Sequence, residues 1–365
     1  VTGVQTCALP ICEQGGIIGR MGAVFSIIED NHIHHINNMM ELGGAEVAGI
    51  KLHAAIDVIM RRNHIHHSTM GIWTDWEAQG TRITCNLLHD NQRPAYASPL
   101  RGGMGSEDIF VEVGHGPTLI DNNILLSDAT LRIATQGVAM VHNLICGAFT
   151  SVGAGTDWRY TPYHMPHRTE VMGFMTILHG DDRFYNNIFF QKHPKTSLVS
   201  RFEDGRVEVE NRVAGTHVWD QYPVYEEWIK NFDMESDTPD MEKLAAAHFD
   251  KLPVWIDGNA YFGGALHFCK EQNYLMDDKS DVYVNVREED DKVYLDTNLA
   301  DAIGSFTGFL ITTDVLGKAF EPRQRFEDKD GNDIIFDTDY FGAKRSSIIP
   351  GPFANPDIDG LNVVL

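Results

Sequence analysis

A short motif, an asparagine followed by an apolar and strand-like segment, recurs along the first half of the chain and restricts the folds open to it. Six copies begin at Asn31, Asn63, Asn86, Asn123, Asn143 and Asn187. Their separations of 32, 23, 37, 20 and 44 residues fit a repeat of roughly 20 to 23 residues with insertions in some turns. The segments are short, β-rich and alternate with period two, which argues against a helical repeat. The pattern predicts a solenoid of strands.

The asparagine itself suits the corner between two strands of such a solenoid. Asparagine tolerates the left-handed backbone conformation that corners need, and stacked asparagine side chains can hydrogen-bond from rung to rung as a ladder. A leucine-rich solenoid has a similar period, but its Leu-x-x-Leu-x-Leu pattern is absent. We therefore expect an all-β protein whose core is a parallel β-helix.

The C-terminal part of the chain has a different pattern. The repeat fades after about Gln191, a helix is predicted from about 239 to 249, and DGNAYF around Asn259 resembles a late rung. From about Asp281 the segments VYVNV, KVYLD, FLITT and DIIFD alternate apolar and polar residues. They predict a flanking antiparallel, β-sandwich-like region. We expect a β-helix core at 12–275 and a flanking β-rich domain at 276–365.

The first eleven residues, VTGVQTCALPI, resemble a translated sequencing adapter. A signal peptide is less favoured, because the segment has no initiator Met, no basic start and too short an apolar stretch. We treat 1–11 as non-native, and we expect a metagenomic fragment whose β-helix lacks its first rungs.

Charge and cysteine content narrow the class of partner. Lys plus Arg is 29 against 52 for Asp plus Glu, a net charge of −23, which disfavours nucleic acid and anionic membranes but not a neutral sugar. No apolar run approaches the 18 or so residues of a membrane span. The five cysteines show no CxxC spacing, which favours a reducing, cytoplasmic compartment.

Two carboxylates occupy the same position in consecutive rungs. The strands that precede the asparagine are GIWTD, ending at Asp75, and DIFVE, ending at Glu112. Each acid lies eleven residues before its asparagine and alternation directs both outward. Neighbouring parallel strands lie about 4.7 to 4.9 Å apart. That spacing is close to the roughly 5 to 5.5 Å between the carboxyl groups of a retaining glycosidase, and below the roughly 6.5 to 9.5 Å of an inverting one.

The neighbours of this pair fit a sugar site only in part. Trp73 and Phe110 point outward beside the acids and are predicted to form an apolar wall for a pyranose ring, while His53 falls approximately in the carboxylate column. The alternative is a solvated acidic face whose like charges are relieved by Lys51 or Arg132. Arg132 lies eleven residues before Asn143 and is expected beside Glu112, which opposes the catalytic interpretation.

The repeated HIHH segments raise the question of a metal site. Histidine is a common zinc ligand, but alternation is expected to divide residues 32–35 between two faces, and no HExxH partner exists. We expect a stacked, hydrogen-bonded polar column and no metal.

Three long motifs connect the chain to a known family. GIWTDWEAQGTR, DIFVEVGHGPTLIDNNILLS and YHMPHRTEVMGFMTILHGDDRFYNNIFF resemble glycoside hydrolase family 120, β-xylosidases with a right-handed parallel β-helix and a flanking β-rich region, and the likeness runs from about Phe25 to the C-terminus. The resemblance implies that Asp75 is the nucleophile, Glu112 the general acid/base and Glu46 a third acidic residue at the sugar. It also implies a homotetramer.

The resulting prediction is an exo-acting, retaining β-xylosidase that uses double displacement on β-xylosides and short xylo-oligosaccharides, as in xylan degradation, with no cofactor. Further residues are predicted to line the sugar site: His53, Trp73, Trp76, His115, His164 and His167. An insertion at about 93–107 between the carboxylate motifs departs from the family pattern and leaves the substrate range open. The alternatives are a pectin-type hydrolase or lyase, which the acidic charge disfavours, and a non-catalytic glycan-binding β-helix.

Overall fold

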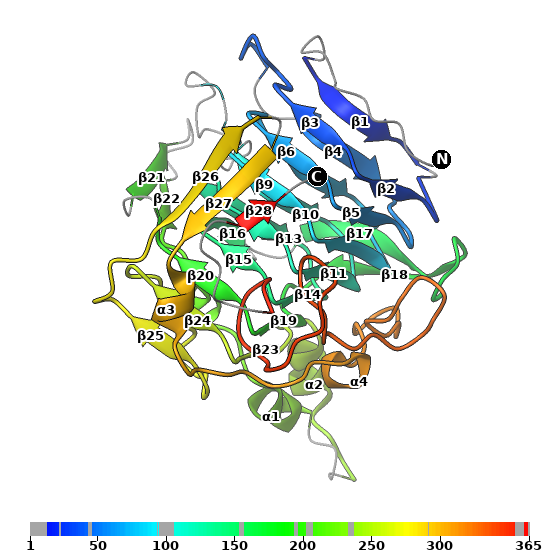
Figure 1. The fold of residues 1–365 in the computed structure, drawn as a ribbon. Coiled ribbons are helices and arrows are strands. Elements are labelled where there is room, and N and C mark those ends of the chain that lie inside the picture. The colour runs from blue at the N-terminus through cyan, green and yellow to red at the C-terminus, as the bar shows by residue number, and fades with distance from the viewer. Residues whose placement is uncertain are drawn as a thin grey trace.

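Three parallel sheets wrap around one apolar core in the computed structural model (Figure 1). The structure describes residues 13–21, 23–42, 46–92, 94, 106–152, 157–192, 196–201, 207–232, 237–290, 292–354 and 361–363. The adapter-like residues 1–11 and most of the insertion at 93–107 lie outside these ranges. Each sheet takes about one strand from each rung, so the arrangement fits the predicted parallel β-helix.

The strands of each sheet follow one another along the solenoid axis. Sheet A contains β1 (Gly15–Gly19), β4 (Ala48–His53), β7 (Ile72–Asp75), β10 (Glu107–Glu112), β13 (Ala129–Ala134) and β16 (Ala148–Val152). Sheet B contains β2 (Ile27–Glu29), β5 (Ile59–Arg61), β8 (Thr81–Thr84), β11 (Thr118–Asp121), β14 (Val138–Val141), β19 (Asp182–Tyr185) and β23 (Val254–Asp257). Sheet C contains β3 (His32–His34), β6 (His64–His66), β9 (Leu87–His89), β12 (Ile124–Leu125), β15 (Leu144–Ile145), β20 (Ile188–Phe190), β24 (Ala260–Phe262) and β25 (Leu275–Asp277).

Alternation along each strand explains why the core forms. In sheet A, Ile50 pairs with Ile72, Ile72 with Ile109, and Ile109 with Leu131, and all four are buried in the same cluster. Stacking equal side chains in register removes one apolar column from water along the whole solenoid, which is the main stabilising effect of the fold.

An asparagine ladder joins the rungs, as predicted, and includes Asn259 as a late rung. Each side-chain amide donates to the carbonyl oxygen of the next asparagine at 2.8 to 3.1 Å, and the last one, Asn259, donates to Glu271. One detail of the prediction is wrong: the left-handed residue is the one that precedes each ladder asparagine, such as Arg62 or Asn122. The corner therefore turns one residue earlier, and the asparagine side chain is free to enter the stack.

Short helices and hairpins extend from the coils. The hairpins are β17 (Asp157–His164) with β18 (Val171–Ile177), and β21 (Thr196–Arg201) with β22 (Val207–Arg212). The helical segments are η2 (His217–Trp219), α1 (Tyr225–Trp228), η3 (Ile229–Asn231) and α2 (Met241–His248). The helix predicted near 239–249 is α2, and Asp240 caps it by accepting from the backbone N–H groups of Glu242 and Lys243. Trp219 fills the core between Phe149 and Phe184.

The predicted flanking β-sandwich is wrong. The antiparallel structure described after Asp281 is one small sheet of β26 (Val284–Glu289), β27 (Lys292–Thr297) and β28 (Leu361–Val363). FLITT and DIIFD form no strands. An isolated antiparallel bridge joins them between Thr312 and Ile335, beside α4 (Thr313–Leu316), which follows α3 (Leu299–Ile303).

This flanking segment buries its apolar residues on the β-helix. Val284 and Leu295 share a cluster with Leu87 and Ile124 on the outer face of sheet C. Figure 1 shows the β26–β27 hairpin lying across the strands of that sheet. The alternation in the flanking segment therefore arises because one face of its hairpin packs on sheet C. The apolar face of the hairpin needs no second flanking sheet to cover it.

Among the helices of the described residues, none combines the length and apolar character required to cross a bilayer.

Candidate active site

Asp75 and Glu112 end neighbouring strands of sheet A in the same register. Thr74 on β7 pairs with Val111 on β10, so the next residue of each strand is one of the two acids. The core-facing Ile72 and Ile109 are buried and the two carboxylates are partly exposed. The stacking inferred from residue counting is therefore present in the fold.

Asp75 lies at the centre of an ion-pair cluster. Its Oδ2 is 2.6 Å from Nζ of Lys51 and 2.9 Å from Nε2 of His53, which pairs with Asp75 in strand register. The Lys51 ammonium is also 3.0 Å from a carboxylate oxygen of Glu46. The cluster thus contains Asp75, His53 and Glu46, which were predicted for the site. It also contains Lys51, which was expected only to relieve the repulsion between like charges.

Trp73 connects this cluster to Glu112. The Lys51 ammonium lies 3.1 Å from the centroid of the indole ring, and the Phe110 ring stacks on Trp73 with centroids 5.1 Å apart. The indole N–H donates to Oε2 of Glu112 at 3.1 Å. Trp73 and Phe110 therefore do not form the exposed apolar wall that was predicted for a pyranose ring. Both aromatic residues are buried and the faces of Trp73 are covered by Lys51 and Phe110, so Trp73 acts on Glu112 through its N–H.

Arg132 occupies a different place from the one expected. Ala134 pairs with Glu112 in strand register, while Arg132 pairs with Phe110. The Arg132 guanidinium binds the buried carboxylate of Glu107 at 3.2 Å. Ala134 lies nine residues before Asn143, two fewer than the eleven assumed, and this shorter connection places Ala134 beside Glu112.

Trp76 and His115 contact the β17–β18 hairpin. The Trp76 indole N–H lies 3.4 Å from Oγ1 of Thr161, and Nε2 of the buried His115 lies 3.1 Å from the backbone oxygen of the same threonine. Burial lowers the pKa of His115 to about 4. Both predicted residues therefore contact β17 of this hairpin.

His164 and His167 bind carboxylates of the protein. His164 is buried, with Nε2 at 3.3 Å from Glu77. His167 lies 2.9 Å from Asp57 and 3.3 Å from Glu327. Burial lowers the pKa of His167, but these two carboxylates outweigh burial and raise its pKa above the ordinary value.

Both histidines thus fasten the 165–170 turn to the corners of the β-helix. The ring nitrogens that were predicted to contact the sugar serve this anchoring.

The ion-pair cluster is poorly suited to a metal, although Glu46, His53 and Asp75 bring three ligand atoms within 4.8 Å of one another. The buried ammonium of Lys51 already lies among these groups. A divalent cation would meet electrostatic repulsion from Lys51, so the cluster favours a site that uses carboxylates directly.

The arrangement provides two carboxylates with different surroundings at one edge of sheet A. Asp75 pairs with the Lys51 ammonium, whose positive charge stabilises a carboxylate anion, and contacts His53, whereas Glu112 accepts from the neutral N–H of Trp73. Unequal environments are what allow two carboxyl groups to divide nucleophilic and acid/base roles.

The chain is similar to a solved protein. It matches the structure of XylC in complex with xylose with a TM-score of 0.81 and 36% sequence identity, over 96% of this chain and 50% of the XylC chain. The present chain thus spans about half the length of XylC. No protein-family model and no curated protein matches the chain. The similarity to XylC shows that the β-helix and its flanking segment follow the fold of a protein solved with a bound sugar.

Proposed function

We propose that the chain carries the catalytic site of a retaining β-xylosidase of glycoside hydrolase family 120. The observation that supports the proposal best is the pair of Asp75 and Glu112 in register on neighbouring strands, one ion-paired with Lys51 and the other hydrogen-bonded to Trp73. The similarity to XylC, which was solved with xylose, favours a xylose unit as the sugar.

The reaction proceeds by double displacement in this proposal. Asp75 attacks the anomeric carbon while Glu112 donates its proton to the glycosidic oxygen, so that the bond from carbon to the leaving oxygen breaks. In the second step Glu112 removes a proton from water, the water oxygen bonds to the anomeric carbon, and the Asp75 ester is released. The β configuration is retained because each step inverts the same carbon.

The substrate range in the proposal is that of an exo-acting enzyme on β-xylosides and short xylo-oligosaccharides. Glu46 has a half-exposed side chain at the open side of the cluster, where it can accept hydrogen bonds from sugar hydroxyl groups. His53 keeps a buried Nδ1 without a partner among the described residues. We also propose a homotetramer and a cytoplasmic location, as the family resemblance and the cysteine pattern suggest.

The test is hydrolysis of an aryl β-xyloside by the parent chain and by the variants Asp75→Ala and Glu112→Ala. We expect both variants to lose at least about 10³-fold in kcat/KM, and NMR of the first product to show the β anomer.

Azide should partly restore Glu112→Ala, because azide attacks the glycosyl-enzyme intermediate without a general base and forms the β-xylosyl azide. An α anomer as the first product, an unsaturated product, or a variant as fast as the parent would contradict the proposal.

A further inference from the structure

Seven histidines lie on the outer face of sheet C and its following corner, on a different sheet from the carboxylate pair. His32 pairs with His64 in strand register, and His66 pairs with both His34 and His89. The intervening Ile33, Ile65 and Leu88 point into the core. The two remaining members, His35 and His67, occupy the corner positions. Alternation divides residues 32–35 as expected, with Ile33 in the core, but His32 and His34 share the outer face because positions two apart on a strand point the same way.

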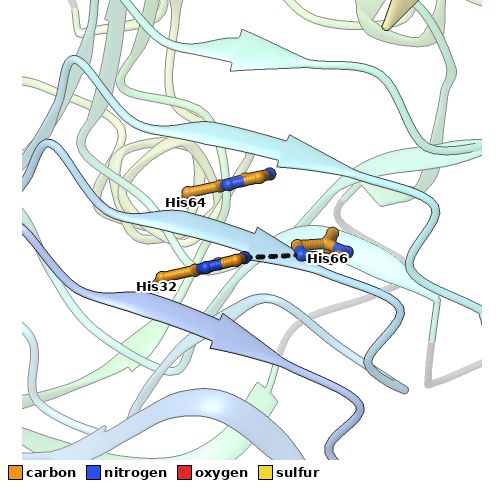
Figure 2. Close-up of side chains that lie close together, drawn as sticks. All are labelled: His32, His64 and His66. Carbon is orange, nitrogen blue, oxygen red and sulfur yellow. Dashed lines mark hydrogen bonds between the residues drawn. The ribbon is translucent and has the colours of Figure 1, made fainter. Parts of the chain in front are cut away.

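The imidazole nitrogens approach one another closely. Nε2 of His32 lies 2.8 Å from Nε2 of His66, and Nε2 of His64 lies 2.7 Å from Nε2 of His89. Figure 2 shows the parallel rings of His32 and His64, which stack with centroids 4.6 Å apart, and the contact of His32 with His66.

Burial disfavours the charged form of these rings. His64, His66 and His89 are at most 4% exposed. Neutral imidazole is the form that offers a lone pair to a metal ion.

Asp90 orients one ring in the way that metal-ligating histidines are usually oriented. Its Oδ2 lies 2.7 Å from Nδ1 of His89. A carboxylate at Nδ1 holds the proton on that nitrogen and leaves the lone pair on Nε2. The Nε2 lone pair of His89 thus points toward Nε2 of His64, 2.7 Å away.

A carboxylate from a distant part of the chain completes the group. Glu288, on β26 of the flanking hairpin, places Oε1 at 3.9 Å from Nε2 of His89 and at 3.9 Å from Nδ1 of His66. Ligand atoms of His64, His89 and Glu288 all lie within 4.8 Å of one another, and so do those of His32, His64 and His66. The two trios share His64.

We infer that this face binds one divalent transition-metal ion at a site centred on His64, with the remaining ligands drawn from His32, His66, His89 and Glu288. The ligand set of imidazoles with one carboxylate suits borderline ions such as Zn²⁺, Co²⁺ and Ni²⁺ better than Mg²⁺ or Ca²⁺.

Zinc–nitrogen bonds of about 2.0 to 2.1 Å in a tetrahedron separate the ligand nitrogens by about 3.3 Å. The observed 2.7 to 3.9 Å contacts bracket that value, so small ring rotations are sufficient to admit the ion.

The ion would join the flanking hairpin to the rungs of the β-helix. Glu288 comes from β26, while the histidines come from β3, β6 and β9. A metal ion that binds the native state and not the unfolded state raises the free energy of unfolding. The proposed site is therefore a structural one, separate from the proposed sugar chemistry.

The test is titration of the full chain, first dialysed against a chelator, with Co²⁺ followed by visible absorption and with Zn²⁺ followed by calorimetry. We expect one equivalent of Co²⁺ to give d–d absorption bands and Zn²⁺ to displace it. We also expect saturating Zn²⁺ to raise Tm by several degrees.

Two variants and two controls identify the ligands. His64→Gln should weaken Zn²⁺ binding roughly 100-fold or more, and Glu288→Gln, which changes an exposed side chain, roughly tenfold while the protein stays folded. His248→Gln on α2, an exposed histidine, should leave the affinity unchanged. Asp75→Asn should also leave it unchanged, because it alters only the other cluster.

The inference is overturned if the folded parent shows no saturable Zn²⁺ binding, or if Glu288→Gln and His64→Gln both bind with the parent affinity. In either case the histidines form only a hydrogen-bonded stack. Loss of binding in Asp75→Asn would instead place the ion at the carboxylate cluster and equally overturn the inference.

Discussion

Lys51 is fully buried although it lies on the outward side of a β-helix strand. A buried ammonium is costly unless it is paired, and here its partners are Asp75, Glu46 and the π face of Trp73. Lys51 therefore fixes the relative positions of two acids and one aromatic ring of the proposed site.

Replacing Lys51 tests this positioning. Lys51→Met keeps the length of the side chain and removes the charge, so the kcat/KM on an aryl β-xyloside is expected to fall by roughly 10²-fold. Circular dichroism should show that the variant is still folded. Lys243→Met, on the exposed face of α2, is the matched control and should keep the parent activity. A Lys51→Met variant within threefold of the parent would assign Lys51 a role in packing alone.

At the scale of the structural elements, the asparagine ladder joins the turns that precede sheet C. Asn86 is buried, and its side chain donates to the Met60 backbone oxygen and to Asn123. Its Oδ1 accepts from both the backbone and the side chain of Asn63. Removing one member leaves polar groups unpaired on both neighbouring rungs.

We expect Asn86→Ala to lower the free energy of unfolding by roughly 2 to 5 kcal/mol, measured by urea denaturation. The control is Asn231→Ala at the exposed end of η3, which should change stability by less than about 0.5 kcal/mol. Equal stability of the two variants would show that water replaces the ladder contacts.

Glu271 ends the ladder and makes stability depend on pH. Its Oε1 accepts from Asn259, its Oε2 accepts from the hydroxyl of Tyr261, and burial raises its pKa to about 7. A raised pKa means that the folded state holds the proton more tightly than the unfolded state. The stability that protonated Glu271 contributes is therefore fully present below about pH 4.5 and is lost as pH rises through about 7.

Glu271→Gln keeps an acceptor for Asn259 without the charge. We expect its stability relative to the parent to increase between pH 5 and pH 8, by up to about 3 kcal/mol. Urea denaturation at several pH values measures this difference. Glu226→Gln, at an exposed position on α1, is the control and should follow the parent curve. A constant difference between Glu271→Gln and the parent would contradict the proposed titration.

At the scale of the whole molecule, the segment after β25 covers two outer faces of the β-helix. Its residues share one cluster with sheet C and another with sheet B, where Phe326 and Phe336 pack with Leu119 and Val141. We propose that the boundary near 275–276 separates two parts of the chain that differ in architecture and share these clusters.

A chain that ends at residue 280 is expected to expose both clusters and to associate, because apolar patches of this kind promote aggregation. Size-exclusion chromatography and binding of an apolar dye should report this. A chain that ends at residue 354 keeps the packed aromatics and should behave like the parent. If the shorter chain stayed soluble with an unchanged elution volume and cooperative unfolding, the covering role of the segment would be refuted.

The repeating part of the protein follows from local sequence patterns. Period-two alternation and the recurring asparagine are local properties, so the β-helix, the asparagine ladder and the register of Asp75 with Glu112 could be inferred from counting. Counting failed at Arg132, where a loop changes length between strand and asparagine.

Which distant groups meet depends on the folded chain. The covering of Trp73 by Lys51, the packing of the flank on sheet C and the approach of Glu288 to His66 depend on side-chain rotamers and on segments up to 222 residues apart. Alternation in the flank resembles that of a sandwich strand because an apolar face is required in both cases. Which surface that face covers is set by the packing of the folded chain, which no local pattern encodes.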